Sequence, residues 1–293
     1  MALDALPVLV VIGGGGIGLA TALRLGPGHH ILLASRSAST LATASEALKQ
    51  AGHKFTTQQV DVTSYASVRA VAKAAASLGG AIAAVVLTSA ISPSMGDAAK
   101  IYEVDVLGTA NVIAAFGAEV EMPRGSSLVC VGSMAQYMGP PMSDALERHL
   151  ALAPLGELLK NDEMWEMGRA HEGAAYCIAK KANVLRVAAA AASKEYAGKG
   201  VRVNCVSPGC TETKMLREEM ASASGEGIRA TIEGLPVPRA GTAEEMADGV
   251  AFVVGCGYIN GVDILIDGGC MAAQRWGSLV VRRDWCYMTR NRS

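Results

Sequence analysis

The stretch that decides the fold is VVIGGGGIGLATAL, residues Val10 to Leu23. An apolar run ends at Ile12, a run of glycines follows, and a helical pattern begins directly after it. Gly13, Gly15 and Gly18 fit the spacing G-x-G-x-x-G, in which glycine lets the backbone turn tightly and approach a pyrophosphate at a helix N-terminus. The spacing alone is a weak signal, but its position between a strand and a helix predicts a nucleotide-binding turn, with a mere tight turn as the alternative.

Outward from this turn, apolar runs alternate with helical patterns. The expected strands are Val8–Ile12, Ile31–Ser35, Phe55–Val60, Ala81–Thr88, Ser127–Val131, Val201–Val206 and Asp263–Ile266. The expected helices are Ile17–Leu25, Ser39–Ala51, Ser64–Leu78, Ala98–Phe116, Ala174–Lys199 and Ala243–Val254. Continuous Val/Ile/Leu runs between helices are typical of a parallel sheet that is covered on both faces. The sequence therefore predicts an α/β protein, a doubly wound Rossmann fold with a seven-stranded, mainly parallel sheet flanked by helices on both faces.

Composition agrees with one well-buried domain, which we place at residues 1–270. Hydrophobic residues make up 51% of the 293 residues, charged residues 18%, and the net charge is −1, so neither nucleic acid nor a membrane is an expected partner. The seven cysteines lack metal-ligand spacing, so we expect reduced thiols and no metal site. The N-terminal stretch lacks the basic region of a secretion signal, and we expect a cytoplasmic protein.

Two segments do not fit the alternation of strands and helices. Residues 138–172 carry two helix-like pieces and are rich in methionine. Residues 271–293 form a basic, aromatic C-terminal tail that is either a packed arm or frayed. Neither segment has the composition of a second domain.

The residues after the second expected strand bear on cofactor choice. An acidic residue at this place would bind a ribose 2′-hydroxyl, but the chain has Ser35, Arg36 and Ser37. Arginine can bind a 2′-phosphate, so NADP is favoured over NAD, with a solvated surface arginine as the alternative. Asp61 and Val62 end the third strand, where they could contact the adenine or simply lead into the next helix.

A phenol and an amine are spaced for one helix face in EGAAYCIAKKANVL, residues 172–185. Tyr176 and Lys180 are four residues apart, so on a helix their head groups lie one above the other. Ser133 ends the fifth strand at the carboxyl edge of the sheet, where ligands of such folds bind. We therefore expect these three side chains to meet at one site.

Five motifs occur in the order that is typical of one known family. They are the glycine turn, Val-Gly-Ser ending at Ser133, Tyr176-x-x-x-Lys180, N-x-V-x-P-G-x-x-x-T from Asn204 to Thr213, and a closing DILIDGG. Over residues 8–269 the chain resembles a short-chain dehydrogenase/reductase of the compact, single-domain branch. The glycine turn is one residue shorter than in that family, so it resembles the wider Rossmann fingerprint.

The resemblance implies a role for each site residue. Tyr176 would be the general acid for carbonyl reduction and the base for alcohol oxidation, and Lys180 would lower its pKa from about 10 and hold the nicotinamide ribose. Ser133 would bind the substrate oxygen. The expected cofactor-binding residues are Gly13, Gly15, Gly16, Ile17, Gly18, Ser35, Arg36, Ser37, Asp61, Val62, Ala90, Tyr176, Lys180, Pro208, Gly209, Thr211 and Thr213.

Two departures from the family concern the reaction centre. Asp105 stands where the family has an Asn that helps hold a water in the proton relay behind the lysine. We expect Asp105 to keep this relay role as a fourth catalytic residue, with a capping or turn role as the alternative. Far more residues separate Ser133 from Tyr176 than in the family, and the excess is the 138–172 insertion. Flexible methionines beside a reaction centre indicate a lid or pocket wall, and a subunit contact or plain surface packing is the competing interpretation.

These observations together predict an NADP(H)-dependent carbonyl reductase or alcohol dehydrogenase for a medium-sized, mainly apolar ketone or secondary alcohol. The alternatives are a non-catalytic NADP-sensing regulatory protein and a hydroxysteroid-type dehydrogenase that uses NAD. The family assembles as dimers or tetramers through its long helices, here 98–116 and 174–199, so a homo-oligomer is expected.

Overall fold

A computed structural model describes residues 5–170 and 173–280 of the chain, with side chains to residue 276. The strands are β1 Val8–Ile12, β2 His30–Ser35, β3 Lys54–Gln59, β4 Ile82–Leu87, β5 Ser127–Val131, β6 Arg202–Pro208 and β7 Asp263–Ile266. The helices are α1 Ile17–Leu25, α2 Ala38–Gln50, α3 Tyr65–Ser77, α4 Ala98–Ile101, α5 Gly108–Ala118, α6 Asp144–Leu152, α7 Asp162–Gly168, α8 Ala174–Ala191, α9 Lys214–Met220, α10 Gly225–Glu233, α11 Ala243–Gly255 and α12 Cys270–Val280.

The seven strands form one sheet in the order β3-β2-β1-β4-β5-β6-β7, and every neighbouring pair is parallel. Chain order runs one way from β1 to β3 and the other way from β4 to β7. The reversal lies between β1 and β4, where Ile12 pairs with Leu87. Ligands of such sheets bind beyond the carboxyl ends of the strands at this reversal. The glycine turn follows β1 at that edge.

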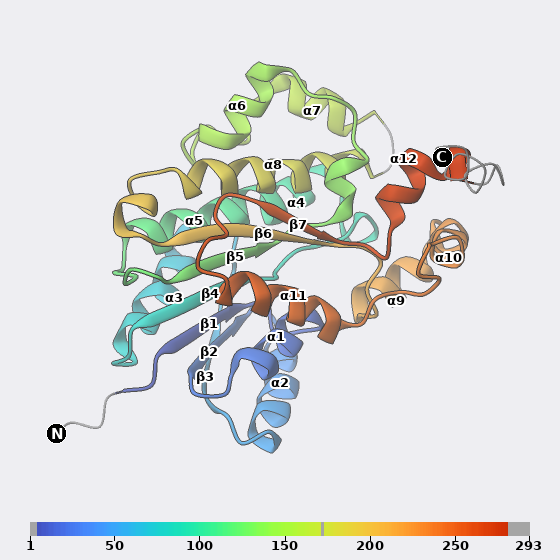
Figure 1. Cartoon of the computed structure of the whole chain (residues 1–293). Coiled ribbons are helices and arrows are strands. Elements are labelled where there is room, and N and C mark those ends of the chain that lie inside the picture. Colours follow the sequence, from blue (N-terminus) through green and yellow to red (C-terminus); the bar gives the residue numbers. More distant parts are fainter. Residues whose placement is uncertain (1–4, 171–172, 281–293) are drawn as a thin grey trace, which may run out of the picture.

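Helices cover both faces of the sheet (Figure 1). Because successive side chains of a strand point to opposite faces, β1 contributes to two cores. Val8, Val10 and Ile12 lie in the core beneath α3, α5 and α8, whereas Leu9 and Val11 lie beneath α1, α2 and α11. All five side chains are buried, as a parallel sheet covered on both faces requires. The predicted Rossmann fold is confirmed.

The helix expected over 98–116 is interrupted by a π-helical turn, Tyr102–Leu107, between α4 and α5. The Thr109 hydroxyl donates to the Asp105 carbonyl at 2.8 Å, next to this widened turn. Single π-turns inside α-helices occur frequently at functional sites, and this one carries Asp105. The combined stretch Ala98–Ala118 is long and apolar enough to cross a membrane, but 78% of its 18-residue apolar window is buried inside the protein, as in a core helix.

The inserted segment forms α6 and α7, which pack on the outer side of α8 (Figure 1). Leu146, Leu150, Leu158 and Met164 of this segment are fully buried. Arg186 of α8 donates to the carbonyls of residues 150 and 153 at 3.1 and 2.7 Å, which ties the end of α6 down. The insertion is therefore a second layer on α8, and its apolar side chains are used in that packing.

This arrangement agrees with plain surface packing, one of the interpretations of the insertion. The apolar residues of α6 and α7 are buried against α8. None of the described residues 138–170 lines the cavity at the carboxyl ends of the strands. The lid and the subunit contact stay predictions.

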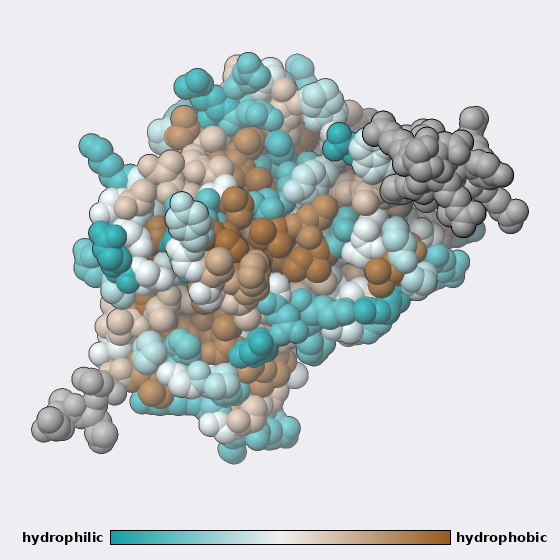
Figure 2. All heavy atoms as spheres, viewed as in Figure 1, coloured by the Kyte–Doolittle hydropathy of each residue, from teal (hydrophilic) through white to brown (hydrophobic). Residues whose placement is uncertain are grey.

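An apolar surface lies at the β7 edge of the sheet. Strand β7 is an edge strand with half-buried side chains, and Phe252, Tyr258 and Val262 beside it are exposed. Figure 2 shows hydrophobic side chains gathered over the middle of this face. The predicted homo-oligomer stays a prediction, and an edge strand with apolar surroundings is where such contact is physically favourable. Of the C-terminal tail, 271–280 belongs to α12, and residues 281–293 lie outside the described residues.

Candidate active site

A cavity of about 510 Å³ opens at the carboxyl ends of the central strands. Among its lining residues are Gly13, Gly15, Gly16, Ile17, Ser35, Arg36, Ser37, Asp61, Val62, Ala90, Ser133, Tyr176, Lys180, Pro208, Gly209, Thr211 and Thr213. The predicted site residues that do not line it are Gly18 and Asp105. The structure therefore brings together almost every residue that the sequence singled out. The remaining two lie behind residues that line the cavity, Gly18 behind Gly13 and Asp105 behind Lys180.

The glycine turn has the geometry that a diphosphate needs. Gly13 has a φ of +116°, and a Cβ there would lie 2.8 Å from the Ser89 amide nitrogen. Gly18 packs against the Gly13 carbonyl, where a side chain would overlap it, so its role is close packing of helix on strand. A Cβ on Gly15 would have only Thr40 near it, at 3.9 Å, so this backbone faces open space. The N-terminus of α1 follows the turn directly, so the turn fits a dinucleotide phosphate.

The adenosine end of the cavity is lined by residues that follow β2 and β3. Ser37 accepts a hydrogen bond from the Thr40 amide at 3.3 Å and begins α2. Arg36 is exposed beside it, and residues 35–37 offer no carboxylate. Asp61 accepts from the Thr63 hydroxyl at 2.8 Å and its amide at 3.0 Å, and the hydroxyl bond above all lowers the Asp61 pKa. Asp61 therefore closes a local turn and presents a charged carboxylate.

The Ser133, Tyr176 and Lys180 side chains converge at the other end of the cavity. Ser133 follows β5 in extended conformation, and its hydroxyl accepts from the Ala135 amide at 3.2 Å. Tyr176 and Lys180 lie one turn apart on α8, with the Lys180 Nζ 5.1 Å from the centre of the Tyr176 ring. All three line the same cavity. The three groups that the sequence predicted to meet do lie together.

The phenol differs from the expectation in one respect. Burial raises the pKa of Tyr176 above its ordinary value, the Lys180 ammonium counteracts this, and the Asp105 carboxylate adds to the rise. A hydrogen bond from Ser133 also favours the phenolate. The net direction is upward, whereas we had expected Lys180 to bring it down. The free-energy cost of removing a phenolate from water is larger than the electrostatic stabilisation that the partly neutralised Lys180 ammonium gives it.

Asp105 is the reason that this ammonium is partly neutralised. Its Oδ2 lies 2.9 Å from the Lys180 Nζ, and both side chains are almost fully buried, at 0% and 1% exposed. Its Oδ1 accepts from the Ile91 amide at 2.9 Å. Burial by itself would lower the pKa of Lys180, but Asp105 and Tyr176 raise it, so the lysine is held as an ammonium. Asp105 therefore contacts the lysine directly.

Residues from outside the predicted set also line the cavity. Six of them are large apolar residues: Met95, Val104, Met134, Met215, Leu216 and Ile228. Glu219 of α9 brings a carboxylate, and its Oε1 accepts from the Ser94 amide at 2.9 Å across the cavity. Helices α9 and α10 are not among the elements predicted from the sequence. The signal that was present is Thr213, whose hydroxyl accepts from the Leu216 amide as an N-cap.

No metal centre is evident in the part of the chain that the structure describes, since no three His, Cys, Asp or Glu side chains there are grouped to hold an ion. The site residues are instead a hydroxyl, a phenol and an ammonium. These groups can bind an oxygen and move a proton. Together with the turn that fits a dinucleotide, they suit hydride transfer with a nicotinamide.

Comparisons with known proteins agree with this chemistry. Residues 7–145 match the family model described as short chain dehydrogenase, and residues 162–271 match that of enoyl-(acyl carrier protein) reductase. The chain is 33% identical to the short-chain dehydrogenase/reductase bsc3 of Alternaria brassicicola, over 90% of this chain and 95% of that protein. It is 31% identical to 2-(S)-hydroxypropyl-CoM dehydrogenase 3 of Xanthobacter autotrophicus, over 90% and 96%.

Solved structures show the same fold. The crystal structure of gox2181 superposes with a TM-score of 0.70 at 24% identity, covering 91% of this chain and 96% of that one. A short-chain dehydrogenase/reductase from Serratia marcescens gives 0.68 at 22% identity, over 90% and 97%. The motifs, the cavity and the relatives agree on an oxidoreductase that uses a nicotinamide cofactor and a small-molecule substrate. The chain belongs to the short-chain dehydrogenase/reductase family.

Proposed function

We propose that this chain is an NADP(H)-dependent carbonyl reductase or alcohol dehydrogenase for a medium-sized, mainly apolar ketone or secondary alcohol. The observation that carries the proposal is one cavity with two chemically different ends. Ser133, Tyr176 and Lys180 lie at one end of the cavity, and Arg36 lines the other end. The glycine turn lines the same cavity. This layout suits a dinucleotide with its reactive ring beside the catalytic side chains.

In the reductive direction the chain's own groups handle the proton. A nicotinamide held in this cavity would supply the hydride for the carbonyl carbon. The Ser133 hydroxyl hydrogen-bonds the substrate oxygen and orients it. Tyr176 gives its hydroxyl proton to that oxygen as negative charge develops there, and the phenolate that remains is stabilised by the Lys180 ammonium. In the oxidative direction the same phenolate takes the proton back.

The expected substrate follows from the side chains that line this cavity. Methionine, leucine, isoleucine and valine are among them, and the lining as a whole is more apolar than polar, so a substrate with an apolar body is favoured. Methionine adapts to irregular shapes, which suits a range of ketones. The relatives named above include 2-(S)-hydroxypropyl-CoM dehydrogenase 3, and a 2-hydroxypropyl group supports a secondary alcohol or ketone as the reacting group.

Turnover is tested by NADPH oxidation with a panel of aliphatic and cyclic ketones. We expect Tyr176→Phe to lower kcat by about 10²–10⁴-fold, because the general acid is lost. Its dissociation constant for NADPH, measured by fluorescence, should change little. Binding of NADPH without turnover of any ketone, identical in the wild type and Tyr176→Phe, would instead identify a nucleotide-sensing protein.

Cofactor choice is tested at Arg36. Loss of a charged hydrogen bond to a 2′-phosphate costs about 1.5–3 kcal/mol, so Arg36→Ala should weaken NADPH binding by roughly 10–100-fold and leave NADH binding unchanged. Arg24→Ala is the matched control, because Arg24 is also exposed but pairs with Asp248 at 2.7 Å, away from the cavity. Equal loss of NADH and NADPH affinity in Arg36→Ala would contradict the NADP assignment.

A further inference from the structure

The buried pair of Asp105 and Lys180 changes what Tyr176 can do. An ammonium next to a phenol stabilises the phenolate, and phenolate is the form needed to take a proton from an alcohol. Here the ammonium is shared with a carboxylate 2.9 Å away, and neither group is exposed to water. The pair as a whole carries no net charge. The phenol therefore faces a neutral pair where a lone cation would favour its ionisation.

We propose that Asp105 is a positioning residue that acts through Lys180: it withdraws the ammonium's charge from Tyr176, keeps that phenol protonated at neutral pH, and so sets the pH range in which reduction and oxidation proceed. This inference rests on the proposed function and adds its pH dependence to it. Reduction begins from the protonated phenol, whose O–H bond breaks as the product O–H bond forms. Oxidation begins from the phenolate, which this arrangement disfavours.

Three other ionisable groups face Tyr176 or Lys180, and none of them favours ionisation of the phenol. Glu219 reaches the cavity from α9 and, like Asp105, raises the pKa of Tyr176. The thiols of Cys130 on β5 and Cys205 on β6 face Lys180 from the sheet. Burial raises the pKa of both thiols, to about 12 for Cys130, so they remain uncharged near neutrality. Lys180 is thus the cation that faces Tyr176, and Asp105 is its closest counter-charge.

The π-helical turn explains why the carboxylate can reach the lysine. Residues 102–107 widen the helix at the point where it passes α8. The Ile91 amide holds one oxygen of Asp105 at 2.9 Å, which fixes the carboxylate and leaves the other oxygen for Lys180. Burial raises the pKa of Asp105, whereas the Lys180 ammonium and the Ile91 amide favour its carboxylate form.

The first test measures Tyr176 directly and needs no turnover. Tyrosinate absorbance is followed against pH in the wild type and in Tyr176→Phe, and the difference between the two curves reports this one phenol. In the wild type we expect it to ionise above the ordinary value of about 10. In Asp105→Asn the midpoint should fall by about one pH unit or more, because the ammonium is no longer neutralised. Glu219→Gln, a charge loss farther from Lys180, should move it less.

The second test measures the pH dependence of turnover. In Asp105→Asn, the loss of ketone reduction at alkaline pH should begin at lower pH, by the amount that the phenol's midpoint falls, because reduction needs the protonated phenol. The alkaline rise of alcohol oxidation should move to lower pH by the same amount. A purely structural role of Asp105 would lower both rates together and leave this pH profile in place.

The outcomes separate the inference from the proposed function. A wild-type Tyr176 that ionises at or below about 10 overturns the inference even if no variant folds. An unmoved midpoint in folded Asp105→Asn overturns it as well. If the midpoint moves as expected but the protein turns over no ketone or alcohol, the effect of Asp105 on Tyr176 is supported and the proposed enzymatic function is contradicted.

Discussion

Two pairs of helices lie outside the regular strand–helix alternation, and they differ in what their apolar side chains contact. The first pair, α6 and α7, precedes the catalytic helix and buries Leu146, Leu150 and Met164 completely. The second pair, α9 and α10, follows β6. Gly225 is its only fully buried residue, so none of its side chains is completely buried. Its Met215, Leu216 and Ile228 are half-buried and line the cavity.

The difference teaches that proximity in sequence to a catalytic residue does not make a segment part of the active site. The insertion adjoins Tyr176 along the chain, yet its apolar surface is used against α8. The pair after β6 leaves its apolar side chains only partly covered, and a half-covered apolar face beside a cavity is what a substrate can complete. We therefore assign packing to α6 and α7, and substrate contact to α9 and α10.

The largest effect is expected from Leu146→Ala. This side chain is fully buried between α6 and α8, so its loss should lower the free energy of unfolding by about 2–5 kcal/mol, through lost burial and the cavity left behind. KM for ketones should stay at the wild-type value in the folded protein. Urea unfolding followed by circular dichroism measures the first quantity, and steady-state NADPH oxidation measures the second.

Leu152→Ala provides the matched control for that experiment. Leu152 ends the same helix but is 62% exposed, so the change in unfolding free energy should be within about 0.5 kcal/mol. A Leu146→Ala protein with normal stability and a strongly raised KM would reverse the assignment. It would return the insertion to the lid role that its methionines suggested.

Much of the fold could be predicted because buried strands leave a strong pattern. Continuous apolar runs such as Val8–Ile12 and Ser127–Val131 were placed at their observed ends, since a parallel sheet covered on both faces has no polar positions to blur them. The helices α9 and α10 could not be predicted in this way. A half-exposed helix such as GEGIRATIE has few apolar residues, and its glycines resemble a loop.

The site shows the same division between local and non-local information. Gly13, Ser133 and Tyr176 could be predicted because short motifs place each one at a strand or helix end on the same edge of the sheet. The contact of Asp105 with Lys180 could not, because it depends on a π-helical turn that no residue type specifies. The Glu219 contact with the turn after β4 spans separate elements and has no local signal at all.

The second-largest effect is expected at Arg186, which ties α6 to α8. Its guanidinium donates to the carbonyls of Leu150 and Ala153, and burial lowers its pKa to about 10, so it remains charged at neutral pH. Arg186→Met keeps the aliphatic packing and loses both bonds, which should cost about 1–3 kcal/mol of unfolding free energy. Thermal unfolding checks this, and unchanged kcat and KM would show again that α6 serves stability.

A smaller effect, on substrate rather than stability, is expected at Glu219. Its carboxylate accepts from the Ser94 amide and holds α9 against the turn that follows β4. In Glu219→Ala this bond is lost, so KM for ketones should rise by about 3–10-fold, as expected for roughly 1 kcal/mol. The unfolding free energy should change little. Glu218→Ala is the control, because Glu218 also lines the cavity but faces Lys214 in an exposed pair at 3.5 Å. A KM that is equal in both variants would contradict a specific contact.

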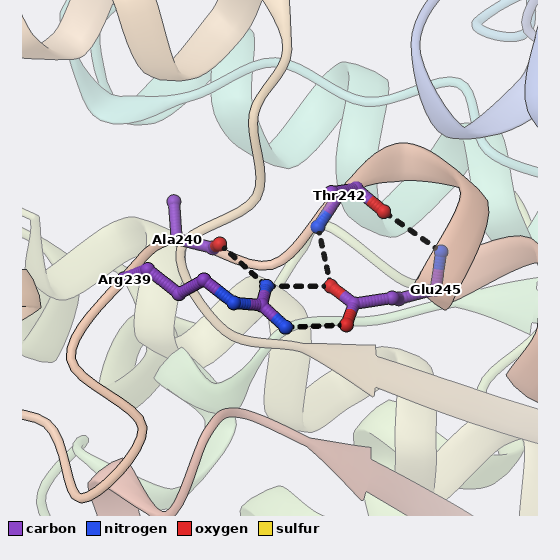
Figure 3. Close-up of polar contacts among 4 residues, drawn as sticks. All are labelled: Arg239, Ala240, Thr242 and Glu245. Carbon is purple, nitrogen blue, oxygen red and sulfur yellow. Dashed lines mark hydrogen bonds and ion pairs between the residues drawn. The ribbon is translucent and has the colours of Figure 1, made fainter.

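The smallest effect is expected where the chain returns from α10 to α11. Figure 3 shows Arg239 paired with Glu245, at 2.6 and 2.8 Å, while Glu245 also accepts from the Thr242 amide at 2.8 Å and completes the cap of α11. The Arg239 hydrogen bond, above all, lowers the Glu245 pKa from 4.5 to about 2. A carboxylate whose pKa is lower in the folded than in the unfolded chain stabilises the fold at every pH above its unfolded-state pKa. For Glu245 this contribution is lost as the pH falls from 4.5 toward 2.

Glu245→Gln should therefore lower Tm at neutral pH by a small amount, and its difference from the wild type should shrink steadily below pH 4.5. Glu244→Gln removes the same charge from the same first turn of α11 and should show no such convergence. The pair is exposed, so added salt should weaken its effect. If Glu245→Gln also leaves KM for ketones unchanged, the end of the α9–α10 segment acts only as an anchor. Substrate contact is then confined to the side chains that face the cavity.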